Sequence, residues 1–178
     1  NPGPVGEKPY EMAGRQQTRP QLFDFQDLSG WVVEGYDAEA ELCRSQDQRL
    51  FSDYCAKLTY TGTGPAPRIV VRPEAPITIP DPWDALNFWN YGNNWGWSPD
   101  PKTPPLNVSI MLRDAAGWDF QLPLGTMYYQ YWFLQNARLH ADHLEKLQRP
   151  VQFVGLQFTN ARNAEPRTVY LGPCEFYK

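Results

Sequence analysis

The chain is poor in the residues that metal sites and disulfide frameworks need. Among its 178 residues there are three cysteines and two histidines. No Cys-x-x-Cys pair occurs, which argues against a zinc site. His140 and His143 lack a third ligand at a regular spacing, so a solvated helical turn is the simpler interpretation of this pair.

An odd number of cysteines leaves at least one thiol unpaired. Cys43 and Cys55 fall on neighbouring predicted strands, where a disulfide would close a short loop and add roughly 3 kcal/mol of stability in the chain-entropy model. Three buried thiols are an equally good interpretation, because free cysteine is often a core residue. Cys174 falls in the last predicted strand and is expected to be packed.

Two further absences restrict the partners. No apolar run approaches the ~20 residues that span a bilayer, and no run of Lys or Arg appears. The formal net charge of −4 does not suit a nucleic-acid-binding surface. We therefore predict neither a membrane nor a nucleic acid as partner. No secretory signal peptide is visible either, so for a secreted protein we expect the chain to begin after the cleavage site or to come from a longer protein.

Signatures of catalysis are also lacking. Glycoside hydrolysis usually needs two carboxylates that flank the bond, and the acidic residues here are scattered along the chain. No Gly-x-Ser-x-Gly elbow, phosphate-binding loop or dinucleotide fingerprint is present. Tyr128, Tyr129 and Tyr131 are available for lyase chemistry, but neither histidine falls on a clear strand. A non-enzymatic protein is predicted, with a polysaccharide lyase or hydrolase as the least favoured alternative.

Aromatic residues, prolines and glycines, in contrast, are abundant. Aromatics make up 15% of the chain, with 18 prolines and 13 glycines, which indicates an ordered chain with many turns and few long helices. Residues 1–20 contain four prolines and three glycines without a hydrophobic period, which predicts a linker or loosely held arm. One β domain is expected over residues 21–178.

Alternation of apolar and polar residues predicts about ten or eleven short strands. Turn signals every 8–12 residues indicate a sandwich or jelly roll, with a helical turn or two at 140–147. Prolines around two of the predicted strands, 68–72 and 77–79, suit an edge or a bulge. The predicted strands cover residues 31–36, 38–44, 54–61, 68–72, 77–79, 85–91, 106–113, 118–124, 128–139, 151–159 and 168–177.

The aromatic residues concentrate in the stretch WDALNFWNYGNNWGW, which holds four of the seven tryptophans. Side chains alternate between the two faces of a strand, so Asn87, Trp89 and Tyr91 share the face opposite to the apolar one. Trp95 and Trp97 follow in a loop rich in Gly and Asn, where binding residues concentrate. Flat rings can stack on a sugar while amides bind its hydroxyls. The alternative is that Trp89 and Tyr91 pack under a loop or against the N-terminal arm.

Polar side chains on the strand over 106–113 were expected to lie beside this aromatic face. Asn107, Ser109 and Arg113 share one side of that strand, and the alternative is an ordinary solvated sheet face. Four arginines would make an anionic-glycan site if they clustered, because Arg binds carboxylate or sulfate in a fork; they are Arg68, Arg72, Arg113 and Arg138. Three tryptophans on apolar faces or beside glycine turns look like core residues, namely Trp31, Trp118 and Trp132. The predicted ligand contacts are Trp89, Tyr91, Trp95, Trp97, Asn87 and Arg113.

Several segments in order resemble the galactose-binding-like β-jelly roll, the fold of many non-catalytic carbohydrate-binding modules. They are FDFQDLSGW, DALNFWNYGNN, LNVSIMLRDAAGWDFQLPLG, VGLQFTN and TVYLGPCEFY. The resemblance spans residues 22–178 and implies an all-β, two-sheet antiparallel sandwich. It also implies a glycan held on a concave sheet face or in loops at one rim. Such modules are often attached to glycan-degrading enzymes of secreted bacterial systems, so an extracellular or cell-surface location and neighbouring domains are expected.

Many proteins of this fold also bind a structural calcium ion through carboxylates near the first strand and an acidic pair before the last. Here the late position reads Leu171-Gly172-Pro173-Cys174 and has no carboxylate. Asp24 and Asp27 remain as early oxygen donors, but calcium takes six to eight oxygens and that set cannot be assembled. No cofactor is predicted, and a structural calcium ion is the alternative.

The function predicted from these features is non-catalytic binding of a polysaccharide or oligosaccharide, as one module of a larger secreted glycan-active protein. The alternative is a structural or protein-interaction β-sandwich without a glycan ligand. In that case the tryptophans hold a loop or meet a neighbouring domain.

Overall fold

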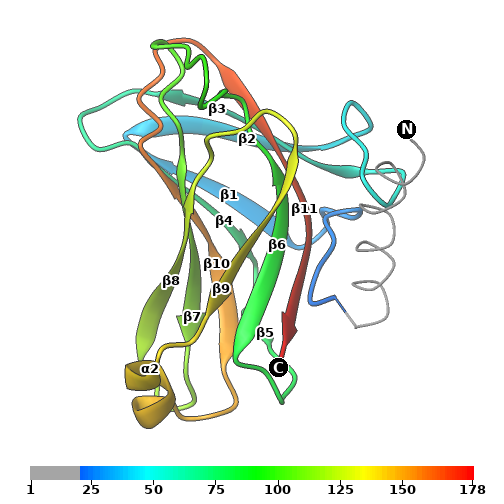
Figure 1. Ribbon diagram of the computed structural model, residues 1–178, viewed down its shortest axis with the longest axis vertical. Helices are drawn as coiled ribbons and strands as arrows, with labels where there is room; N and C mark the ends of the chain where they lie inside the picture. The colour runs from blue at the N-terminus through cyan, green and yellow to red at the C-terminus, as the bar shows by residue number, and fades with distance from the viewer. Residues whose placement is uncertain (1–20) are drawn as a thin grey trace.

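The computed structural model describes residues 21–178 as a sandwich of two antiparallel sheets (Figure 1). The predicted arm at residues 1–20 lies outside the described residues. One sheet has the order β1-β4-β10-β7-β8, with β5 paired to β10, and is called the six-stranded sheet; the five-stranded sheet has the order β2-β3-β11-β6-β9. The strands are β1 (Trp31–Tyr36), β2 (Ala38–Ser45), β3 (Cys55–Gly62), β4 (Arg68–Pro73), β5 (Ile77–Thr78), β6 (Ala85–Tyr91), β7 (Asn107–Arg113), β8 (Asp119–Thr126), β9 (Trp132–Arg138), β10 (Gln152–Thr159) and β11 (Arg167–Tyr177).

The predicted fold class is confirmed, and most predicted strands match within two residues. The strand predicted over 128–139 begins only at Trp132, because the preceding segment turns Met127 and Tyr129 into the core. The predicted edge position is right for β5, which pairs only with β10. It is wrong for β4, which lies between β1 and β10; its apolar run Ile69–Val71 is buried on both faces. Helix α2 (Ala141–Lys146) occupies the predicted helical turn, and no helix in residues 21–178 is long and apolar enough to cross a membrane.

The core fills the space between the two sheets. Leu86 and Phe88 of β6 are fully buried, as alternation predicts, and face apolar side chains of the other sheet. Among the tryptophans predicted to be core, Trp31 packs partly buried against it. Trp118 was misassigned, since it is 38% exposed and stacks over Phe120 with ring centroids 4.7 Å apart.

The three cysteines are free thiols. The proposed Cys43–Cys55 bridge is absent, and the alternative of three buried thiols is wrong at Cys43, which is exposed. Cys55 is buried and its Sγ donates to the carbonyl oxygen of Gln48 at 3.0 Å. Burial raises the pKa of the Cys55 thiol to about 11, which keeps it protonated.

The loops divide between two ends of the sandwich. Helix α2 lies at one end, at the bottom of Figure 1. At the other end, which we call the loop end, β6 finishes at Tyr91 and β9 begins at Trp132, which pair in register. The six-stranded sheet reaches the same end with the row of paired residues Tyr36, Arg68, Thr159, Asn107 and Thr126.

At the α2 end, Asp114 organises the turn between β7 and β8. Its carboxylate is 4% exposed and accepts hydrogen bonds from the backbone amides of Ala116, Trp118 and Gln148, at 2.9, 2.9 and 3.0 Å. These bonds, led by the one from Trp118, hold the pKa of Asp114 below its ordinary value of 3.8.

Replacing Asp114 with Asn is expected to lower the melting temperature at pH 7 and to flatten its decline in acid. Because the folded pKa lies below 3.8, the carboxylate stabilises the fold fully above that pH, and its contribution is lost as the pH falls through the folded pKa. Thermal unfolding at pH 7 and at about pH 3 measures both effects. The exposed Asp142 provides the control substitution Asp142→Asn, and an unchanged melting temperature for Asp114→Asn would contradict the assignment.

Candidate functional site

The outer face of the five-stranded sheet carries a row of aromatic rings from three adjacent strands. Tyr91 meets Trp132 and Tyr170 edge-on, with centroid separations of 5.8 and 5.7 Å. The indole of Trp132 also lies against Gly172 of β11, where an added Cβ would come within 3.0 Å of its Cζ3 atom. Trp132 therefore belongs to this outer face, and its prediction as a core residue is wrong. The rings are half-buried because each covers the edge of the next.

Trp89 lies on the same face as Tyr91 and Asn87, as predicted. Its indole meets the ring of Phe51 edge-on at 5.5 Å, so the loop between β2 and β3 packs over it. Asn87 donates to Glu175 at 3.1 Å and accepts from the Tyr177 hydroxyl at 3.2 Å. Packing is therefore one role of these side chains; their contact with a ligand stays a prediction.

Arg113 does not belong to this face. β7 pairs with β10 and β8, so Asn107, Ser109 and Arg113 line the outer face of the other sheet. The expectation that they lie beside Trp89 is wrong, because the chain crosses between the sheets after Tyr91. At the α2 end, Arg113 forms a two-fold ion pair with Asp119, with N–O distances of 2.6 and 3.0 Å.

The four arginines that would make an anionic-glycan site if they clustered do not come together. Three of them lie on the six-stranded sheet, whereas Arg138 lies on β9 and pairs with Asp84 at 3.1 Å. Arg72 is occupied by Glu34, which accepts from its Nε at 2.8 Å. Arg68 differs, since its guanidinium stacks on a tyrosine ring rather than meeting a carboxylate.

The loop over residues 92–105 holds two exposed tryptophans at the loop end. Asn94 lies on the inner side of this loop and is 3% exposed. Its side-chain NH₂ group donates to the carbonyl oxygen of Thr103 at 2.5 Å, and its side-chain oxygen accepts from the backbone amide of Asp100 at 3.2 Å. The amide of Gly96 donates to the carbonyl of Tyr128 at 3.3 Å, which joins the loop to the segment before β9. Internal hydrogen bonds thus determine the loop's shape.

A group of exposed aromatic side chains forms beside this loop. Trp95 and Tyr131 have ring centroids 5.6 Å apart at an angle of 51°, and Tyr131 meets Phe133 at 6.2 Å. Trp97 is 91% exposed. Five of the eight exposed large hydrophobic residues in the described chain gather here, so this is its main aromatic surface. We call it the rim platform, made of Trp95, Trp97, Tyr128, Tyr131 and Phe133.

A buried polar network supports the rim platform from below. Tyr129 stacks on Phe133 with centroids 4.7 Å apart, and its hydroxyl donates to the side chain of Asn90. Asn90 is fully buried and donates to Gln135 at 2.8 Å. Burial raises the pKa of Tyr129, so its hydroxyl remains a donor at physiological pH.

Sequence reasoning found two members of the rim platform, Trp95 and Trp97, and missed its other half. Tyr128 and Tyr131 were considered only for lyase chemistry, and Phe133 was not singled out. The available signal was the run YYQYWF at the start of a predicted strand. Consecutive aromatic residues on a strand point to opposite faces, so some of these rings had to point away from the core.

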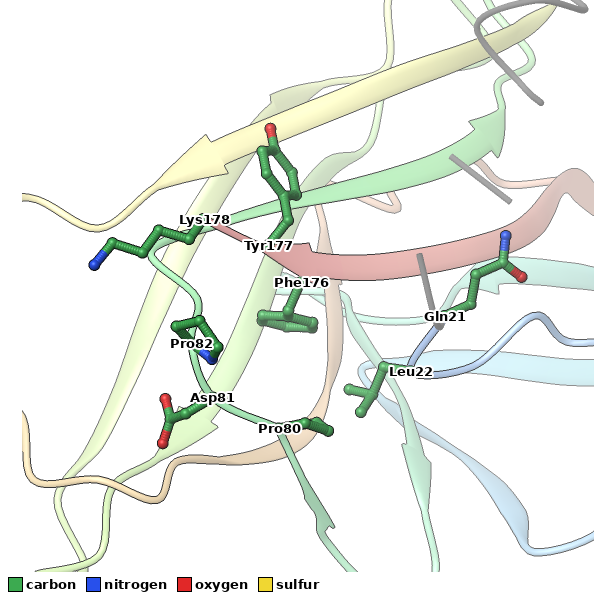
Figure 2. A pocket seen from close by; sticks show the side chains of 8 residues that line it. All are labelled: Gln21, Leu22, Pro80, Asp81, Pro82, Phe176, Tyr177 and Lys178. Atoms are coloured by element: carbon green, nitrogen blue, oxygen red, sulfur yellow. The ribbon is translucent and has the colours of Figure 1, made fainter. Parts of the chain in front are cut away.

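A pocket with a volume of about 460 Å³ lies at the α2 end, away from the rim platform. In Figure 2, Leu22, Pro80 and Pro82 surround the ring of Phe176, while the side chain of Lys178 points away. The described wall is mainly apolar and holds none of the predicted ligand contacts. A sugar needs polar partners for its hydroxyls, so this pocket is the weaker candidate.

Within residues 21–178, no group of three or more His, Cys, Asp or Glu side chains could hold a metal ion. Asp24 and Asp27 each accept a hydrogen bond from a backbone amide two residues ahead, at 3.1 and 2.9 Å. His143 packs against the ring of Phe120 with centroids 5.5 Å apart.

No known family model matches the sequence, and no curated protein matches it. Solved structures do match. A carbohydrate-binding module of the β-sandwich superfamily, studied for promiscuous specificity, aligns with a TM-score of 0.66 and 15% identity over 89% of this chain; the match covers 62% of that chain, less than two thirds of its length. A family 61 module in complex with β-1,4-galactotriose gives 0.54 and 10% identity over 90% of this chain and 99% of its own.

A family 11 module from Clostridium thermocellum, in complex with a β-1,3-1,4-mixed-linked tetrasaccharide, gives a TM-score of 0.53 and 12% identity over 88% of this chain and 94% of its own. The chain has the fold of these carbohydrate-binding modules. The predicted galactose-binding-like jelly roll is thereby confirmed as a fold. At such identities the likeness concerns the fold alone, and the site must be argued from this chain's own side chains.

Proposed function

We propose that this chain is a non-catalytic carbohydrate-binding module that holds its glycan on the rim platform. The observation that carries the proposal is the gathering of exposed rings from two segments, with Trp95 and Tyr131 tilted toward one another. The C–H faces of a sugar ring are apolar and its hydroxyls lie at the edge. Exposed aromatic rings therefore offer the matching surface, and polar groups around them bind the hydroxyls.

The electrostatics of the carboxyl groups support binding rather than hydrolysis. A general acid needs a raised pKa, whereas six carboxyl groups in residues 21–178 have a pKa that is shifted downward. Hydrogen bonds from backbone amides, Arg, Lys or hydroxyl groups are the main causes. The groups are Asp27, Glu34, Asp47, Asp100, Asp114 and Asp119.

The wider setting is part of the same proposal. Two of the structural neighbours were solved with oligosaccharides, and we infer a polysaccharide or oligosaccharide ligand for this chain as well. Stacked rings contribute about 1 kcal/mol each beyond area burial, so we expect an affinity in the micromolar to millimolar range. A weak module of this kind suits attachment to other domains of a secreted, glycan-active protein.

Calorimetry and glycan arrays with plant, algal and host polysaccharides test the proposal on the native chain. We expect heat of binding with at least one of them and a shift of tryptophan emission, since Trp95 and Trp97 lose water on binding. No heat, together with emission that acrylamide quenches but sugars do not shift, would instead support the structural or protein-interaction sandwich. Release of reducing ends or unsaturated products would overturn the non-catalytic role.

A further inference from the structure

A groove of about 450 Å³ opens at the loop end, on the outer face of the six-stranded sheet. Arg68, Asn107 and Thr159 come from three adjacent strands and lie in one register row. Asn160 and Arg162 follow β10 and also line the groove, and Ala66 and Pro67 before β4 complete the lining. Neither Asn160 nor Arg162 was singled out in the sequence.

The two arginines of the groove, like Arg44 and Arg49, have no carboxylate partner within residues 21–178. Five other arginines in the described chain have a carboxylate within 4.0 Å, namely Arg72, Arg113, Arg138, Arg149 and Arg167. In residues 21–178 neither Arg68 nor Arg162 has such a carboxylate. The Arg68 guanidinium stacks on the Tyr36 ring at 4.1 Å and donates to Gln157 at 3.3 Å, which orients it and leaves its charge uncompensated by contact.

The amides and hydroxyls of the groove add further hydrogen-bond donors. Asn107 uses its side-chain oxygen to accept from Thr126 at 2.6 Å, which turns its NH₂ group toward other partners. Asn160 donates to the carbonyl of Pro105 at 2.8 Å and so ties the groove to the loop over residues 92–105. Two guanidinium groups with an amide donor form a set that favours an oxyanion.

Two acidic side chains near the groove have hydrogen-bond partners of their own. Asp37, in the turn between β1 and β2, accepts a hydrogen bond at 3.1 Å from the backbone amide of Ala66, which lines the groove. Glu34 is held by Arg72 and by the Tyr36 hydroxyl, which donates to it at 3.0 Å. Hydrogen bonds from Arg72, together with the charge of Arg68, lower the pKa of Glu34. Three guanidinium groups (Arg68, Arg72 and Arg162) and two carboxylates (Glu34 and Asp37) thus lie in this region of a chain whose net charge is −4.

The groove and the rim platform are close along the loop end. Asn107 and Thr126 are hydrogen-bonded at the groove, and Tyr128 of the rim platform lies two residues beyond Thr126. The amide of Met127 donates to the carbonyl of Leu106 at 2.8 Å and holds these two segments together. One oligosaccharide can thus contact both surfaces.

We propose that this groove binds an anionic substituent, a carboxylate or a sulfate, on the glycan whose rings stack on the rim platform. The ligand class is then an acidic polysaccharide. This inference rests on the proposed function and adds the charge of the ligand to it. Arginine suits the role because its planar fork matches carboxylate and sulfate and stays charged at any physiological pH.

Matched pairs of polysaccharides test the inference with the native chain. Polygalacturonate is compared with its fully methyl-esterified form, and a sulfated galactan with the same galactan after desulfation. We expect at least about tenfold tighter binding to the charged member of one pair in dilute salt. The difference should shrink strongly as NaCl rises from about 0.05 to 0.5 M, because salt screens the exposed guanidinium groups. The pair that shows it identifies the substituent.

Arg162→Gln and Arg68→Gln should each reduce binding of the charged form by about tenfold and leave the neutral form within about twofold. The exposed position of Arg162 makes loss of folding an unlikely cause, and Arg113→Gln, at the far end of the same sheet face, is the matched control. Equal binding of charged and neutral forms, or a preference retained in both variants, would overturn the inference while leaving the rim platform intact. Failure of every polysaccharide to bind would overturn the proposed function itself.

Discussion

Replacing Trp95 and Tyr131 together by alanine is expected to weaken glycan binding by about 30-fold, which corresponds to a loss of about 2 kcal/mol. Both rings are exposed and tilted toward one another with centroids 5.6 Å apart, so a sugar placed between them loses two stacking partners. Their removal should cost little stability, because neither ring is buried. Calorimetry with the best polysaccharide from the array measures the change, and circular dichroism checks the fold.

Trp118→Ala is the matched control for this result. Trp118 is also an exposed tryptophan, 38% accessible, but it stacks on Phe120 near α2, away from the rim platform. Its removal should leave affinity within about twofold.

Trp89→Ala separates the two candidate surfaces, which are the rim platform and the outer face of the five-stranded sheet. If it abolishes binding while the double variant binds normally, the ligand lies on the five-stranded sheet, with Trp89, Tyr91 and Asn87 as its contacts.

Asn90→Ala is expected to lower the free energy of unfolding by about 3 kcal/mol. Asn90 is fully buried, accepts from the Tyr129 hydroxyl and donates to Gln135. Its removal leaves two buried polar groups without a partner, and each such group costs roughly 1–3 kcal/mol. Urea unfolding followed by fluorescence measures the change at constant m-value.

The same variant should also weaken glycan binding, although Asn90 is buried beneath the rim platform. Tyr129 stacks on Phe133, so a shift of Tyr129 moves the platform. Tyr129→Phe is the graded comparison, because it keeps the ring and removes only the hydroxyl; we expect a smaller loss of about 1–2 kcal/mol. A stability loss for Asn90→Ala no larger than that for Asn87→Ala on the outer face would contradict a buried network.

Local residue patterns were sufficient to predict the strands. Alternation in Ala85–Tyr91 predicted both the strand and its faces, since Leu86 and Phe88 are buried whereas Asn87 and Trp89 face outward. The same reasoning worked for β7, whose apolar face is buried. Burial of one face is a local requirement, because side chains on a strand alternate regardless of which strand lies next to it.

Local residue patterns could not predict which strands lie next to one another in a sheet. Strands that follow one another often pair, which placed Arg113 beside Trp89, but here the chain changes sheet between β6 and β7. The groove has the same origin, because Arg68, Asn107 and Arg162 lie far apart in the sequence and meet only through the strand order. Position along the strand also decided exposure, since Phe133 at the loop end of β9 is 42% exposed whereas Gln135 on the same face of β9 is 4% exposed.

By itself, the sequence determined that this protein is a β-sandwich whose aromatic residues exceed what one core can bury. Alternation and turn residues act within a few positions, and they suffice for strands, faces and fold class. Only the tertiary structure decided which rings remain open to water, and that two unpaired guanidinium groups share a groove. Those outcomes depend on contacts between distant segments, whose geometry is determined by the packing of the two sheets rather than by any local pattern.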